Sequence, residues 1–156
     1  MTGRRATARF GASCPEPVTR PHLKHGYYVL EGINAFATAY YFTYLFFFMQ
    51  ARFGYGNFEN LLLSAANGFV YTIAAWWGGR FAQRFGCFSA LWLGFGTMCL
   101  ALGAGSLVRG LAGQWLVMGA WTVGMCFTWP ALEALVSEWE NERSLSRRIG
   151  IYNLSW

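Results

Sequence analysis

Four long apolar stretches constrain the fold of this chain more than any other feature. They cover residues 27–49, 61–79, 85–108 and 110–132, and Glu31 is the one ionised residue within them. Because an α-helix rises about 1.5 Å per residue, about 20 residues cross the ~30 Å hydrocarbon core of a bilayer. A soluble domain of this size could not bury four such segments. We therefore predict an all-α fold, a polytopic membrane helix bundle.

The basic residues predict how this bundle is oriented. The chain has a formal net charge of +5, and five of its 12 basic residues precede the first apolar stretch. The connections 80–84 and 138–148 are also rich in arginine, whereas 50–60 and the turn at Arg109 carry one each. Since cytoplasmic loops carry an excess of Lys and Arg, we expect a cytoplasmic N-terminus in the plasma membrane. Basic residues placed in this way indicate lipid contact and no nucleic-acid partner.

Residues 1–26 differ from the rest of the chain in composition. They hold three prolines and five basic residues with one acid, so we predict a disordered cytoplasmic tail. The four cysteines have neither the spacing of a metal site nor that of a disulfide framework. No nucleophile motif or phosphate-binding loop is present. We expect no enzyme activity, no metal and no cofactor.

Residues 79–86 connect the second and third apolar stretches, and the spacing of Gly79, Arg84 and Gly86 within them resembles a motif of the major facilitator superfamily of transporters. The motif reads roughly G-x-x-x-D-[RK]-x-G-[RK]-[RK] and lies between the second and third helices of the family. Residues 79–86 (GRFAQRFG) match it at Gly79, Arg84 and Gly86. Gln83 replaces the Asp of the motif, and Cys87 and Phe88 replace its two basic residues.

The end of the fourth stretch is similar to the same family. Residues 129–135 (WPALEAL), followed by Arg148-x-Gly150 and Tyr152, resemble the family's passage from the fourth to the fifth helix. The resemblance covers residues 27–156 and implies part of the N-terminal six-helix half of a transporter. Residues 149–156 would then begin a fifth helix. We expect the chain to be the N-terminal portion of a longer protein that supplies the missing C-terminal helices.

Polar side chains within the stretches form lines at helical spacing. Asn34, Thr38 and Tyr41 share one face of the first helix, and Thr122, Cys126 and Trp129 share one face of the fourth. In the family, helices 1 and 4 line the central cavity, so the resemblance makes these six residues candidates for contact with a small-molecule substrate. Alternatively, they hydrogen-bond neighbouring helices to one another.

Two carboxylates lie near the membrane interior. Glu31 is either an interfacial acid favoured by the positive N-terminal end of the first helix, or a group that couples transport to a proton or cation. Glu133 lies near the cytoplasmic exit, where we expect an ion pair with Arg80 or Arg84. Gly78 and Gly79 are expected to form a tight turn between two antiparallel helices, and Gly86 is expected to begin the next helix.

The resemblance implies secondary active transport of a small solute by alternating access. The alternative from the same residues is a small four-helix integral membrane protein with a scaffolding or assembly role. Pairs of small residues four apart, such as Ala74/Gly78 and Ala120/Gly124, allow close helix packing under both interpretations.

Overall fold

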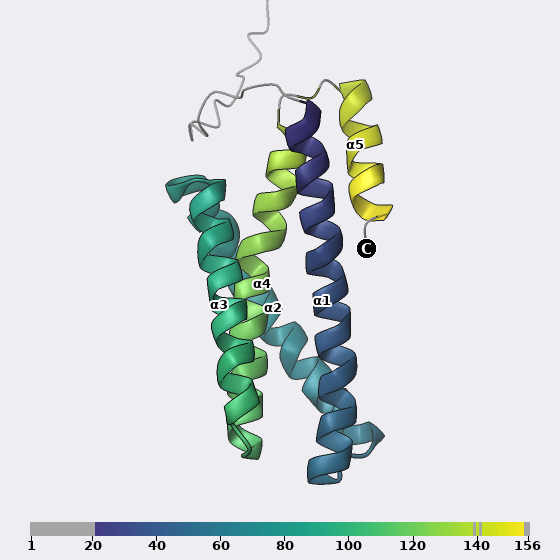
Figure 1. Cartoon of the computed structure of the whole chain (residues 1–156), viewed down its shortest axis with the longest axis vertical. Coiled ribbons are helices and arrows are strands. Elements are labelled where there is room, and N and C mark those ends of the chain that lie inside the picture. The colour runs from purple at the N-terminus through teal and green to yellow at the C-terminus, as the bar shows by residue number, and fades with distance from the viewer. Residues whose placement is uncertain (1–20, 139, 141, 155–156) are drawn as a thin grey trace, which may run out of the picture.

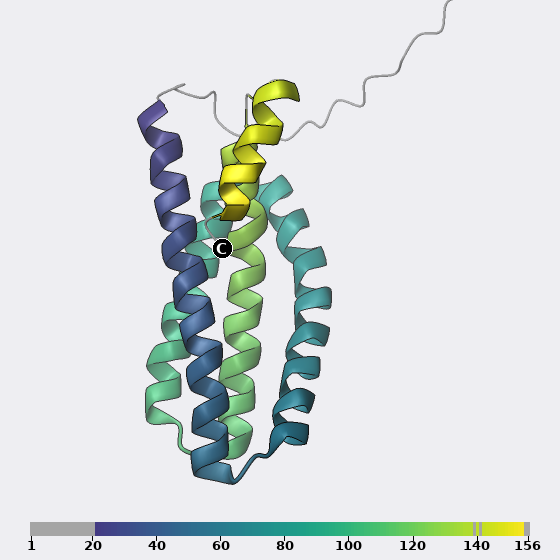
Figure 2. The same cartoon turned by 90° about the vertical axis from the view of Figure 1, so that its right-hand side faces the viewer.

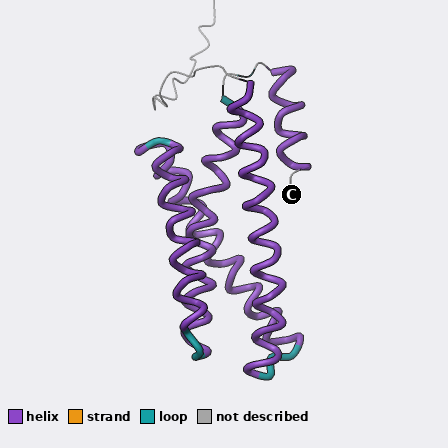
Figure 3. Tube along the Cα trace, in the orientation of Figure 1, coloured by secondary structure: helices purple, strands orange, loops and turns teal. Residues whose placement is uncertain are grey.

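The structure, a computed structural model, describes residues 21–154 except 139 and 141. This part of the chain is helical throughout and contains no strand (Figures 1 and 3). Its five helices are α1 (Pro21–Phe53), α2 (Asn57–Phe85), α3 (Cys87–Leu107), α4 (Leu111–Ser137) and α5 (Glu142–Leu154). The predicted all-α helix bundle is confirmed.

Helices α1 to α4 alternate in direction along the long axis of the molecule, and α4 is the central helix of the bundle. It packs against each of the other four helices, most extensively against α3 and α2. The short α5 packs against α4, at the end of the bundle where α1 begins (Figures 1 and 2). The start of α1, the α2–α3 connection and the α4–α5 connection share one end of the bundle (Figure 1).

Helices α1, α2 and α5 begin earlier than the sequence indicated, α2 at Asn57 and not at residue 61. Helix α1 starts at Pro21, inside the segment 1–26 that we expected to be disordered, and residues 1–20 lie outside the described part. Proline at the first helical position costs no hydrogen bond, because the first N–H groups of a helix have no partner within it. Helix α5 starts at Glu142 and not at residue 149, since the charged residues before the apolar run continue the same helix.

The expected turn at Gly78 and Gly79 is wrong. Helix α2 continues through both glycines to Phe85, and the chain reverses at Gly86 alone, where φ is 91°. An L-residue rarely adopts this φ, so glycine is needed at Gly86 for the turn. The segment that matches the transporter motif is therefore the last two turns of α2 and one glycine.

Gly78 serves a different purpose, the close approach of α2 to α4. A Cβ atom on Gly78 would lie 2.1 Å from the carbonyl oxygen of Cys126. Pro130 lies inside α4 and has no N–H group, so the Cys126 carbonyl cannot receive the usual helical hydrogen bond. The absent side chain at Gly78 leaves room for this carbonyl, and a Cα–H···O contact is the interaction that such an approach allows.

Helices α3 and α4 are in equally close contact. A Cβ on Gly94 would lie 2.7 Å from the Gly124 carbonyl oxygen, and a Cβ on Gly124 would lie 2.8 Å from that of Gly94. Small residues allow two helix backbones to approach in this way. Three glycines thus fix α2, α3 and α4 against one another.

The buried apolar side chains form two clusters, one toward each end of the bundle. The first surrounds Trp121 and includes Tyr41, Leu45, Met49 and Met118. The second contains Cys87, Leu91, Leu132, Leu135 and Tyr152, among others. Between the two clusters lie buried polar residues of α1 and α4: Glu31, Asn34, Thr38, Thr122 and Thr128. The middle of the bundle is therefore a polar layer.

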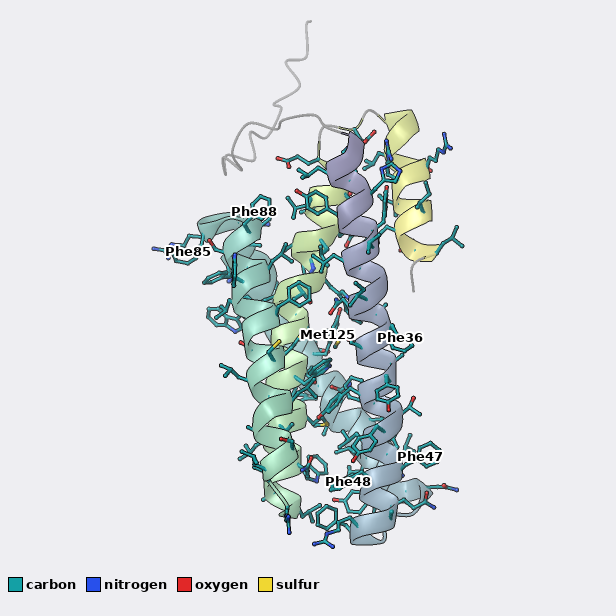
Figure 4. All side chains as sticks on the ribbon, in the orientation of Figure 1. Phe36, Phe47, Phe48, Phe85, Phe88 and Met125 are labelled. Carbon is teal, nitrogen blue, oxygen red and sulfur yellow. The ribbon has the colours of Figure 1, made fainter. Side chains whose placement is uncertain are left out.

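Of the described helices, α3 and α4 are long and apolar enough to cross a membrane. Helices α1 and α2 are long enough, but their Tyr, Trp, Asn and Gly residues lower the mean hydropathy without adding many charges. Large apolar side chains cover much of the surface. Phe36 and Phe47, for example, point away from α1 and are 73% and 67% exposed (Figure 4).

Candidate functional site

Glu31 lies at the centre of the site that the structure indicates. Its side chain is completely buried, with 0% of the residue exposed. Because α1 begins at Pro21, Glu31 lies well beyond the first turn, where the positive end of a helix stabilises an acid. The positive end of α1 therefore does not stabilise Glu31, and its carboxylate belongs to the bundle interior.

Three helices surround the Glu31 carboxylate. Asn34 of α1 and Tyr152 of α5 interact with it electrostatically, and so does the more distant Glu133 of α4. Within the described part of the chain, neither carboxylate oxygen has a partner at hydrogen-bond distance. The Tyr152 hydroxyl donates to the backbone oxygen of Trp129 at 3.4 Å, which joins α5 to α4 beside the carboxylate. A buried acid with polar neighbours and no close partner is a candidate for binding a proton or a ligand.

The predicted line of polar residues on α1 faces α4. Asn34, Thr38 and Tyr41 are all buried. The Asn34 side-chain nitrogen donates to Thr128 Oγ1 at 3.4 Å. The Tyr41 ring stacks on Trp121 with 4.7 Å between ring centroids. The three candidates on α1 are thus brought together along one helix interface.

The predicted line on α4 faces a different helix, α2. The Thr122 hydroxyl has the Asn67 side-chain oxygen and the Met118 carbonyl as acceptors. Cys126 Sγ donates to the Tyr71 carbonyl at 3.6 Å, and the Trp129 ring packs edge-on against that of Tyr71. The two lines therefore do not face one another. Helical spacing predicts that the polar residues of one line share a helix face. It does not predict which neighbouring helix this face contacts, because that depends on the packing of the whole bundle.

The expected ion pair of Glu133 is not formed in the described part of the chain. Glu133 is exposed, and the guanidinium groups of Arg80 and Arg84 lie over aromatic rings. Arg80 is 4.2 Å from the centroid of Trp76, a distance typical of a cation–π contact. Gln83 is exposed at the same end of α2.

A cluster of charges that the sequence did not indicate closes the end of the bundle above Glu31. The Glu140 carboxylate contacts both Lys24 of α1 and Arg148 of α5, the latter at 3.2 Å. Lys24 Nζ also donates to the backbone oxygen of Glu138 at 3.0 Å. The pKa of Arg148 is raised above its ordinary value, first by the Tyr28 hydroxyl and then by the charge of Glu140. Lys24 lies 116 residues from Glu140 in the sequence, so spacing gave no indication of this contact.

At the opposite end, a cavity of about 510 Å³ lies between α1, α3 and α4. Its walls include Tyr41, Tyr44 and Phe48 of α1, together with Gln114. Arg52 and Arg109, the basic residues at this end of the described chain, also line it. Of the six predicted substrate contacts, Tyr41 is part of this wall. The volume lies in the range of small-molecule sites.

Comparison of the chain with protein-family models, with curated proteins and with solved structures gives no match.

Proposed function

We propose that this chain is part of a secondary transporter of the major facilitator type, which carries a small solute across the cytoplasmic membrane by alternating access. The observation that carries the proposal is the fully buried carboxylate of Glu31 within the polar layer of the bundle. Ionisable groups in a membrane interior are costly, and those that persist usually bind an ion, a proton or a substrate. A purely structural bundle would be better served by an apolar residue at this position.

The placement of the connections supports the proposed orientation. The α2–α3 and α4–α5 connections lie at the end where α1 begins, and that end holds Lys24, Arg80, Arg84 and Arg148 (Figure 1). The other end carries Arg52 and Arg109. By the distribution of basic residues, the first end is cytoplasmic. The apolar surface, including the exposed rings of Phe36 and Phe47, then contacts lipid.

The proposal also defines what lies outside the described bundle. In a transporter of this type, the solute binds near mid-membrane between two helical halves. The polar layer of α1 and α4 would form part of that site, and further helices of a longer chain would complete it. Glu31 would bind the coupling proton or cation.

Uptake measurements test the proposal. The protein, expressed with whatever sequence follows residue 156 in its gene, is assayed for concentrative uptake of a panel of radiolabelled sugars, amino acids, organic acids and amines. At least one solute should accumulate, and Glu31→Gln should lower that accumulation at least about tenfold, the usual cost of removing a proton-transfer group. Thr72→Val is the matched control, because Thr72 is exposed and its hydroxyl donates only to Gly68 O of its own helix.

If the protein is a scaffold, no solute should accumulate, and Glu31→Gln should have no effect on its function. Absence of uptake for every solute class, together with co-purification of a stable membrane complex that survives Glu31→Gln, would contradict transport. Uptake that is equal in the wild type and in Glu31→Gln would contradict the role of the buried carboxylate.

A further inference from the structure

Five residues of α1 carry buried oxygen atoms that have no hydrogen-bond partner within the described chain, the half-buried Tyr28 among them. The other four contribute both carboxylate oxygens of Glu31, Asn34 Oδ1, Thr38 Oγ1 and the Tyr41 hydroxyl. The residues are 0%, 2%, 8% and 8% exposed, respectively. Polar atoms buried in a protein are almost always bonded to protein or to ordered water. Exceptions at every turn of one helix from Tyr28 to Tyr41 require a common explanation.

The four residues form one continuous line on α1. They are three or four positions apart, so each lies one turn from the next on the same face. Side chains with this spacing lie about 5–6 Å apart on a helix. An O–H···O hydrogen bond is about 2.7–2.8 Å long, so one water molecule between each pair completes an unbroken chain of hydrogen bonds. Buried waters satisfy such groups in many proteins.

We propose that this line is a hydrated proton path that connects the cavity between α1, α3 and α4 with the carboxylate of Glu31. Tyr41 lies at one end of the line and also forms part of the cavity wall. Glu31 lies at the other end, about 15 Å further along the helix. The inference deepens the proposed transport function, on which it rests, by naming the proton as the coupling ion.

The chemistry of the path is a reversible proton transfer. A proton from water in the cavity passes along the hydroxyl groups of Tyr41 and Thr38 and the water molecules beside them. Asn34 Oδ1 only accepts hydrogen bonds, so it orients the water that delivers the proton to one carboxylate oxygen of Glu31, which becomes a neutral carboxylic acid. The reverse steps release the proton. Tyr152 of α5 and Glu133 of α4 are the titratable groups that act on Glu31 from the helices packed against it. Beyond Glu31, the Tyr28 hydroxyl continues the line by one turn, and the contacts of Glu140 with Lys24 and Arg148 lie at the cytoplasmic end.

The extent of the line favours a proton over a single metal cation. Oxygen ligands of one Ca²⁺ ion lie about 2.3–2.6 Å from it, so they lie within about 5 Å of one another. Glu31 and Tyr41 are separated by about three times that distance. The described residues also contain no group of three acidic, histidine or cysteine side chains that could hold a metal ion.

Infrared spectroscopy of the protein in lipid vesicles tests the path without knowledge of the solute. At acidic pH, the spectrum should contain a carboxylic acid C=O band that is missing in Glu31→Gln. On transfer to D2O, this band should shift rapidly in the wild type and at least about tenfold more slowly in Thr38→Val, which breaks the chain of hydrogen bonds. Thr38→Ser should restore rapid exchange, and Thr72→Val should leave it unchanged.

Three results would overturn the inference. The first is the absence of a Glu31 band at every pH at which the protein stays folded, as checked by circular dichroism. The second is equal exchange in the wild type and in Thr38→Val. The third is a response of the band to Na⁺ and not to pH. Rapid exchange in a protein that takes up no solute would leave the path intact and remove the transport function. Solute uptake by a protein that lacks the Glu31 band would leave the transport function intact and remove the proton path.

Discussion

At the scale of single residues, Gly78 and Gly79 separate two roles of glycine in one helix. Both lie within α2, but only Gly78 faces another backbone, the Cys126 carbonyl that Pro130 leaves without a helical donor. Nothing lies within 4 Å of a Cβ placed on Gly79. Substituting each of these two adjacent glycines therefore separates the effect of close helix packing from that of helix propensity.

Gly78→Ala should lower the stability of the bundle, whereas Gly79→Ala should not. The new methyl group at position 78 would overlap a backbone oxygen, and overpacking of this kind costs about 1–3 kcal/mol. At position 79, alanine favours the helix by about 0.5–1 kcal/mol. Thermal unfolding in detergent, followed by circular dichroism, measures both. A Gly78→Ala protein that unfolds at the wild-type temperature would show that α2 and α4 are not in contact at this point.

The buried polar residues of α1 and α4 could be predicted from the sequence, but the residues that they contact could not. Asn34 and Thr122 were recognised as interior polar residues, because hydrocarbon disfavours them. That Asn34 meets Thr128 and Thr122 meets Asn67 depends on the rotation of α4 between two neighbours, which the spacing within one helix does not determine. The burial of Glu31 could not be predicted either, because it depends on the early start of α1 and on Tyr152 of a fifth helix.

At the scale of elements, α5 is held by charge as well as by packing. Glu140 is the shared partner of Lys24 and Arg148 and lies just before α5 in the chain. These side chains are partly exposed to solvent, so the contacts are screened and each contributes a modest free energy. Their geometry still matters, because they connect the start of α1 to α5.

Glu140→Gln should allow α5 to open more often. A loss of roughly 1 kcal/mol, typical of a partly exposed charge cluster, corresponds to about fivefold faster amide hydrogen exchange in α5. Exchange in α3 should not change. Glu133→Gln provides the control, since Glu133 is exposed and has no ion pair in the described chain. Identical exchange in α5 for both variants would mean that packing alone holds this helix.

At the scale of the whole molecule, the alternation of helix direction determines which connections share a side of the membrane. Asn57 at the start of α2 and Gln83 near its end are both exposed and lie at opposite ends of the bundle. The count of helices and the alternation followed from the sequence, because long apolar stretches and arginine-rich connections are visible in it. The helix ends were less predictable, since glycine and proline occur both inside these helices and at their ends.

Single cysteines at these positions test the orientation. In a protein without its native cysteines, Asn57→Cys should react with an impermeant maleimide from the outside of intact cells. Gln83→Cys should react only after the membrane is permeabilised. Labelling of both positions from the same side would exclude α2 as a membrane-spanning helix and with it the proposed topology.

The contacts at Gly78, Gly94 and Gly124 have a mechanical consequence. With carbonyl oxygens in place of side chains at these three points, α2, α3 and α4 cannot rotate or slide past one another without backbone collision. Helices α1 and α5 pack against this three-helix body less extensively. A change of shape within the described bundle is therefore a displacement of α1, or of α5, relative to α2–α4. Glu31 of α1 interacts with groups of α4 and α5, so either displacement changes the surroundings of its carboxylate.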